Sequence, residues 1–175
     1  MGNSLFPSPL LQNRFPIMIS ACLVGVHCRY DGGHATCRDL VDFFASAPFV
    51  PFCPEQLGGL PTPRPPAIIK SGDGHDILSG QAKIINATGE DVTDAFRKGS
   101  EEAYALARLT GSSLAILKSR SPSCGLKTPH CENASGIGIG VTAAFFQSHG
   151  IKVFELDSDD PFPCKEFIEL LDEVC

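Results

Sequence analysis

Short, uninterrupted apolar runs alternate along this chain with longer segments that have the apolar spacing of helices. The runs contain no regular alternation of apolar with polar residues, and they lie at residues 16–20, 49–55, 113–119 and 151–156. Strands that are apolar on both faces must be covered on both, as in a parallel sheet flanked by helices. The segments with helical spacing are 38–47, 91–110, 138–150 and 163–174. We therefore predict a small doubly wound α/β fold with a mainly parallel sheet.

A further pair of short strands is expected at 67–70 and 81–86, where AIIK and QAKIIN flank the turn-rich stretch SGDGHDILSG. This pattern is typical of two antiparallel strands, which would add a short hairpin insertion to the main sheet. The Gly- and Pro-rich stretch at 56–66 suits neither a helix interior nor a central strand. Residues 1–15 are predicted to form a flexible N-terminal extension.

Composition narrows the class of protein and of partner. A hydrophobic fraction of 43% and a charged fraction of 19% in 175 residues are typical of a globular chain. The net charge of −6 disfavours a broad surface for a nucleic acid duplex, and a small-molecule partner is expected instead. No apolar stretch reaches the roughly 18 residues that a membrane span needs. The start of the chain lacks the features of a signal peptide, so we predict a cytoplasmic protein, as a monomer or small homo-oligomer.

Eight cysteines are many for a reducing compartment, where metal binding or catalysis is a more common use than disulfides. Three of them, Cys22, Cys53 and Cys124, follow three of the predicted strands. Ligands of doubly wound folds bind beyond the carboxyl ends of the strands, so these thiols are expected to converge. The most common use of the others is as small buried apolar side chains.

Converging thiolates suit an iron–sulfur cluster or zinc. The chain has no C-x₂-C pair, the usual element of structural zinc sites. A [4Fe-4S] cluster held by three cysteines would leave one iron open to a substrate atom. Cys28 competes with this interpretation, because a fourth cysteine ligand would close the cluster.

Several long motifs of the chain resemble the bacterial thiouracil desulfurase family. The matching segments are SACLVG-x₂-CRYDGG (20–33), PFCPEQLGGLPTPRPPAII (51–69), GEDVT-x₂-F-x₂-G-x-E (89–101), AILKSRSPSCG (115–125) and GIGVTAAFF-x₃-GI-x-VFE (138–155). The resemblance implies a compact α/β iron–sulfur domain, here residues 16–175. It also implies that the enzyme removes sulfur from 2-thiouracil-like bases or nucleosides by hydrolysis, without net redox change, giving uracil and hydrogen sulfide.

The resemblance further implies roles for individual residues. Cys22, Cys53 and Cys124 would bind the [4Fe-4S] cluster. Glu55 would be the acid/base, assisted by a serine of SRSPSCG, with Ser121 preferred over Ser119. Two further classes of function remain as alternatives: a non-catalytic cluster-bearing or sulfur-trafficking module with a fully ligated cluster, and a structural zinc domain.

The residues themselves leave other roles open. Glu55 could instead form a structural ion pair with Arg64 or Arg120, and either arginine could bind a carbonyl oxygen or an anionic group of a ligand. Segment 127–140 departs from the family pattern and carries the extra cysteine Cys131, so it is expected to border the site, where Cys131 could act as an additional thiol.

Overall fold

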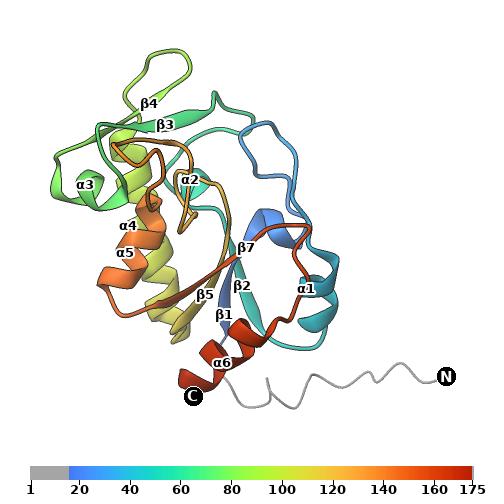
Figure 1. Ribbon diagram of the computed structural model, residues 1–175. Helices are drawn as coiled ribbons and strands as arrows, with labels where there is room; N and C mark the ends of the chain where they lie inside the picture. Colours follow the sequence, from blue (N-terminus) through green and yellow to red (C-terminus); the bar gives the residue numbers. More distant parts are fainter. Residues whose placement is uncertain (1–15, 175) are drawn as a thin grey trace.

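The computed structural model describes residues 16–174, so the extension predicted for residues 1–15 lies outside the described part. Parallel strands in the order β2-β1-β5-β7 form the main sheet, which is covered by helices on both faces (Figure 1). The strands are β1 (Ile17–Ser20), β2 (Phe49–Phe52), β5 (Leu114–Lys118) and β7 (Lys152–Leu156). Because β2 and β5 lie on opposite sides of β1, the direction of winding reverses between β1 and β5, as in doubly wound folds. The predicted fold class is confirmed.

Side chains of each strand alternate between two apolar cores, which explains why the apolar runs are uninterrupted. Ile17 and Ile19 of β1 pack with α1 and α6 on one face of the sheet. Met18 packs with α4 and α5 on the other face. The helices are α1 (Arg38–Phe43), α4 (Thr93–Thr110), α5 (Val141–Ser148) and α6 (Lys165–Glu173). None of the helices within residues 16–174 is both long and apolar enough to cross a bilayer.

The predicted hairpin insertion is part of a separate small sheet with strand order β4-β3-β6. Strands β3 (Ala67–Lys70) and β4 (Lys83–Asn86) are antiparallel as expected, and β6 (Cys131–Glu132) adds in parallel to β3. The connection between β3 and β4 is a helix, α3 (Gly74–Ser79), where the sequence predicted only turns. The cause is a capping box: the Asp73 side chain accepts from the His75 N–H, and the Asp76 side chain accepts from the Asp73 N–H.

Two short helices begin directly after β1 and β2 and carry the residues of the pocket described below. They are the 3₁₀-helix η2 (Ala21–Val24) and α2 (Pro54–Leu57). Helix α2 packs backbone to backbone on α4, because a Cβ atom at Gly99 would lie only 1.9 Å from the Pro54 carbonyl oxygen. A Cβ at Gly58 would meet the Ala95 carbonyl oxygen at the same distance of 1.9 Å. Gly58 and Gly99 are therefore the two residues that let α2 and α4 approach this closely.

Candidate active site

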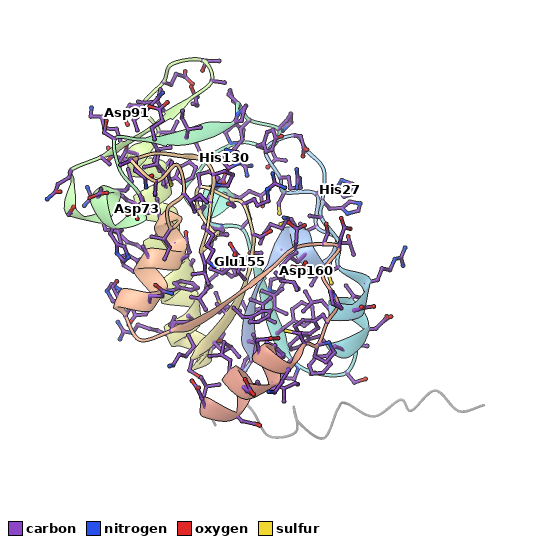
Figure 2. The ribbon with its side chains drawn as sticks, in the orientation of Figure 1. His27, Asp73, Asp91, His130, Glu155 and Asp160 are labelled. Carbon is purple, nitrogen blue, oxygen red and sulfur yellow. The ribbon has the colours of Figure 1, made fainter. Side chains whose placement is uncertain are left out.

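A pocket of about 390 Å³ lies at the carboxyl end of the main sheet, where the strand order reverses. It is lined by the segments that follow β1, β2, β5 and β7. This volume is within the ~300–1,000 Å³ range of small-molecule sites. The second sheet adds Ala67 and His130 to the lining, and His130 lies just before β6 (Figure 2).

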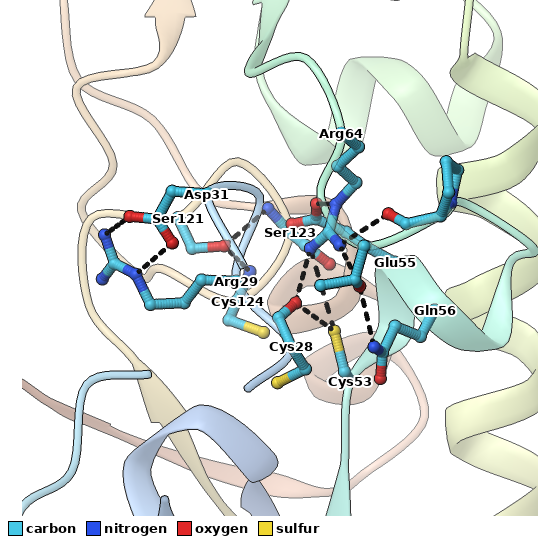
Figure 3. Close-up of polar contacts among 12 residues, drawn as sticks. Cys28, Arg29, Asp31, Cys53, Glu55, Gln56, Arg64, Ser121, Ser123 and Cys124 are labelled. Atoms are coloured by element: carbon cyan, nitrogen blue, oxygen red, sulfur yellow. Dashed lines mark hydrogen bonds and ion pairs between the residues drawn. The ribbon is translucent and has the colours of Figure 1, made fainter. Parts of the chain in front are cut away.

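The structure brings Cys22, Cys53 and Cys124 together in this pocket. Cys22 lies in η2, Cys53 precedes α2, and Cys124 lies in the loop after β5. Cys28 is the fourth cysteine of the lining and is only 1% exposed. Its carbonyl accepts a hydrogen bond from Cys53 Sγ at 3.6 Å (Figure 3). The four sulfur atoms thus belong to one site.

Glu55 lines the pocket and is paired with Arg64, whose side chain is only 5% exposed. Arg64 Nε donates to Glu55 Oε2 at 2.6 Å. Its Nη2 donates to the Cys28 carbonyl oxygen at 3.0 Å and approaches Cys53 Sγ at 4.0 Å (Figure 3). Of the two arginines considered from the sequence as partners of Glu55, Arg64 is the one that binds it. The pair holds the carboxylate beside the cysteines.

The environment of the thiols favours their protonated forms. Hydrogen bonding with Cys22 is the main cause that raises the pKa of Cys28 from 9.0 to about 11. Hydrogen bonding with Cys28, together with burial, raises the pKa of Cys53, and burial raises the pKa of Cys124 to about 12. Metals bind the thiolate, so metal binding at this site must release these protons.

The donor set of the pocket fits an iron–sulfur cluster. Within residues 16–174, no three His, Cys, Asp or Glu side chains close around a single point at which one metal ion would sit. A cluster of four irons and four sulfides is larger than one ion, so its cysteine ligands stand further apart. Arg64 also provides an N–H group directed at a cysteine sulfur, a type of contact that tunes such clusters.

The serines of SRSPSCG have different partners. Ser119 Oγ donates to Asp157 Oδ2 at 2.5 Å and also contacts Lys118 Nζ. Ser121 Oγ accepts from the backbone N–H groups of Ser123 and Cys124, at 3.2 and 3.1 Å. The hydroxyl proton of Ser121 is therefore left for a ligand, whereas that of Ser119 is bound to a carboxylate.

The segment around Cys124 is a tight turn that fixes the thiol. The Gly125 N–H donates to the Ser121 carbonyl at 2.9 Å. A Cβ atom at position 125 would lie 3.0 Å from both the N and the O atom of Ser121, so a side chain there would require the turn to shift by a few tenths of an ångström. The Lys118 N–H at the end of β5 donates to Ser20 Oγ at the end of β1, at 3.0 Å, which links the ends of the two strands.

The sequence model of the 2-thiouracil desulfurase family matches residues 17–158. The chain belongs to this family. The match contains every pocket residue discussed above.

Two relatives extend the family assignment. The uncharacterized protein YbbK of Bacillus subtilis (strain 168) is 43% identical over 140 residues, which cover 78% of this chain and 93% of YbbK. A solved structure described as the [4Fe-4S]-dependent thiouracil desulfidase TudS is 34% identical, with a TM-score of 0.72. The alignment covers 93% of this chain and 100% of TudS, so the similarity is to the whole fold.

Segment 127–140 borders the pocket through His130, but Cys131 does not line it. Cys131 is 5% exposed and packs in the core of the small sheet with Ile69 and Ile77. Its expected role as an additional thiol of the site is therefore wrong. Cys37 is likewise a buried core residue, and Cys175 lies outside the described residues.

Asp157 is a pocket residue that the sequence interpretation missed. It follows β7 directly, and both of its oxygens are bound: Oδ2 by Ser119 and Lys118, and Oδ1 by Ser158. Although its partial burial has the opposite effect, the Ser119 hydroxyl and Lys118 lower the pKa of Asp157. The signal that identified the cysteines was a polar side chain at the carboxyl end of a predicted strand, and the same signal could have identified Asp157.

Proposed function

We propose that this protein removes sulfur from thiolated pyrimidines such as 2-thiouracil by hydrolysis, with a [4Fe-4S] cluster as cofactor, giving uracil and hydrogen sulfide. The observation that carries the proposal is the convergence of Cys22, Cys53 and Cys124 with Glu55 in one pocket. Membership of the 2-thiouracil desulfurase family and similarity to TudS support it. We further propose that residues 16–175 act as one iron–sulfur domain in the cytoplasm, where thiols stay reduced.

The three cysteines would hold the cluster, and Cys28 would remain a buried thiol beside it. An iron without a protein ligand would supply a soft Lewis acid for the thiocarbonyl sulfur. Arg64 would donate an N–H to the Cys53 sulfur, because its Nη2 lies 4.0 Å from that atom. Cys124 is only 6% exposed, so its sulfur is largely shielded from bulk water.

Glu55 would carry the proton transfers of the hydrolysis. Water adds to the thiocarbonyl carbon, a carbon–oxygen bond forms, and the carbon–sulfur bond breaks, with no change in oxidation state. The Glu55 carboxylate takes a proton from the attacking water and passes it to the sulfur. It then takes the second proton, from the new hydroxyl group, as the carbonyl forms and hydrosulfide leaves, and this proton completes hydrogen sulfide. Arg64 keeps Glu55 oriented through the 2.6 Å contact with Oε2.

Ser121 would donate its hydroxyl proton to the substrate. Its oxygen already accepts from two backbone N–H groups, and this polarises the O–H bond toward a further acceptor. Ser119 would instead have a structural role, because it is bound to Asp157 and Lys118.

The proposal is tested by anaerobic incubation of the iron-loaded protein with 2-thiouracil. We expect loss of the near-ultraviolet absorbance of 2-thiouracil and release of uracil and sulfide in equal amounts, without added oxidant or reductant. Glu55→Gln should lower the turnover number by about 10²–10⁴-fold while the iron content stays the same. Iron-loaded protein that leaves 2-thiouracil unchanged would contradict the proposal.

A fully ligated, non-catalytic cluster is the second candidate, because the buried Cys28 lines the same pocket as the three proposed ligands. On that account Cys28 is a fourth ligand, and the protein carries a stable cluster that does not bind a thiocarbonyl. Iron-loaded protein with an unchanged cluster spectrum on addition of 2-thiouracil, and without turnover, would support this second candidate.

A further inference from the structure

The basic residues of the pocket differ in whether a carboxylate neutralises them. Arg64 is paired with Glu55 at 2.6 Å, and Lys118 with Asp157 at 3.2 Å. Arg29, nearer the surface, is paired with Asp31 at 3.3 Å. These cations are therefore engaged with acidic groups of the protein itself.

Arg120 is the exception. It lines the pocket and is exposed, and within residues 16–174 its guanidinium makes no ion pair and no hydrogen bond. Guanidinium is charged at every relevant pH and carries five N–H donors. Arg120 thus offers the pocket a permanent positive charge whose donors are free for a ligand.

The backbone holds Arg120 in an unfavourable conformation at this position. Its φ of 53° is in the left-handed region, which side chains other than that of glycine rarely adopt. Such residues are frequent at functional sites, where the surrounding structure fixes them. Here the Ser121–Gly125 turn follows directly, so Arg120 is attached to the same rigid turn that positions Cys124.

We propose that Arg120 recognises the carbonyl oxygen that a thiolated pyrimidine keeps after one of its oxygens is replaced by sulfur. This inference rests on the proposed function. With the sulfur directed to the cysteine end of the pocket, the remaining oxygen projects from another atom of the ring and needs a donor. Arg120 is the pocket cation with donors free to provide it. A site built to hydrogen-bond an oxygen rejects analogues that lack it, so Arg120 is a specificity residue.

The direct test compares two substrates in iron-loaded wild type and Arg120→Ala. 2-Thiouracil has the second oxygen, and pyrimidine-2-thione has the same thiocarbonyl but no such oxygen. Loss of a charge-assisted hydrogen bond corresponds to about a 10- to 100-fold increase in KM. We expect that increase for 2-thiouracil and little change for pyrimidine-2-thione. Equal increases for both compounds, or no increase for either, would overturn the assignment.

Binding of uracil provides a readout that does not depend on turnover. Uracil has two carbonyl oxygens but no sulfur, so its affinity for the iron-loaded protein, measured by calorimetry, reports the oxygen contact. We expect Arg120→Ala to weaken it by about 10-fold or more, and Arg108→Ala, on the exposed face of α4, to leave it unchanged. Unchanged uracil affinity in Arg120→Ala refutes the role of Arg120, whereas absence of 2-thiouracil turnover in wild type refutes the proposed function.

A glycine variant separates binding from folding. Arg120→Gly and Arg120→Ala both remove the guanidinium, but only glycine adopts the left-handed conformation without strain. We expect Tm of the glycine variant to exceed that of the alanine variant by about 2–4 °C, with the same loss of uracil affinity. Ser71 also has a positive φ, of 62°, and does not line the pocket, so Ser71→Gly is the matched control and should bind uracil normally. Wild-type uracil affinity in Arg120→Gly would overturn the proposal.

Discussion

The ion pair between Arg64 and Glu55 is the most deeply buried charged contact of the pocket, and its removal should destabilise the protein strongly. The Arg64 side chain is 5% exposed and that of Glu55 15%. Arg64→Met keeps much of the apolar volume but removes the charge. It leaves the Glu55 carboxylate without its partner and the Cys28 carbonyl without the donor that lies at 3.0 Å.

The expected magnitude follows from the geometry. Two unit charges at about 4 Å in an effective dielectric constant of about 20 interact by about 4 kcal/mol. Loss of one partner of a buried pair costs about 3–5 kcal/mol. We therefore expect Arg64→Met to lower the free energy of unfolding by about 3 kcal/mol. This corresponds to a decrease in Tm of about 6–12 °C for a chain of this length.

Urea unfolding of the metal-free protein at pH 7 measures the effect, and a double-mutant cycle isolates the pair. Glu55→Gln in the Arg64→Met background should recover most of the lost stability, giving a coupling energy of about 3 kcal/mol. The exposed pair Lys83–Asp91 is the control and should show a much smaller coupling energy. A coupling energy below about 0.5 kcal/mol for Glu55 and Arg64 would refute the reasoning.

Other predictions concern packing and titration. Gly99→Ala should destabilise the protein by about 1–3 kcal/mol in urea unfolding, because the new Cβ would lie 1.9 Å from the Pro54 carbonyl oxygen. Alanine alone would favour the helix, so a stabilised variant would contradict the close packing of α2 on α4. In metal-free protein, the alkylation rate of Cys28, followed by mass spectrometry, should rise about tenfold per pH unit up to its pKa of about 11; a plateau near pH 8 would be inconsistent with the hydrogen-bonded thiol. Thr93 and Lys83 lower the pKa of Asp91 from 3.8 to about 2. The ionised Asp91 carboxylate therefore adds to the free energy of unfolding above pH 3.8, and this stabilisation is lost as the pH falls through 2. Asp91→Asn should therefore cost less than about 1 kcal/mol at pH 7, and a difference from wild type that persists below pH 2 would contradict this cause.

The parallel sheet and the meeting of the cysteines could be predicted because both follow from local patterns. Ile17, Met18 and Ile19 form an apolar run that needs cover on both faces, and the structure provides it. Cys22 and Cys53 lie at or just after the ends of such runs, and the ends of adjacent parallel strands meet in space. No knowledge of side-chain contacts was needed for these predictions.

Other features depend on contacts between residues that are far apart in the sequence, and local sequence patterns do not predict such contacts. Strand β6 has two residues and exists because Cys131 and Glu132 pair with β3. Two arginines were possible partners of Glu55, and only the folded chain shows that Arg64 reaches it. Helix α3, by contrast, had a readable signal in the capping box at Asp73.

The central claim is that Cys22, Cys53 and Cys124 hold a cluster with one iron free of protein ligands. The most direct measurement is the iron and acid-labile sulfide content of anaerobically reconstituted single Cys→Ala variants. The account predicts about four irons and four sulfides per chain for wild type and Cys28→Ala, and loss of both at position 22, 53 or 124. Full cluster content in any of these three variants, or its loss in Cys28→Ala, would contradict the account.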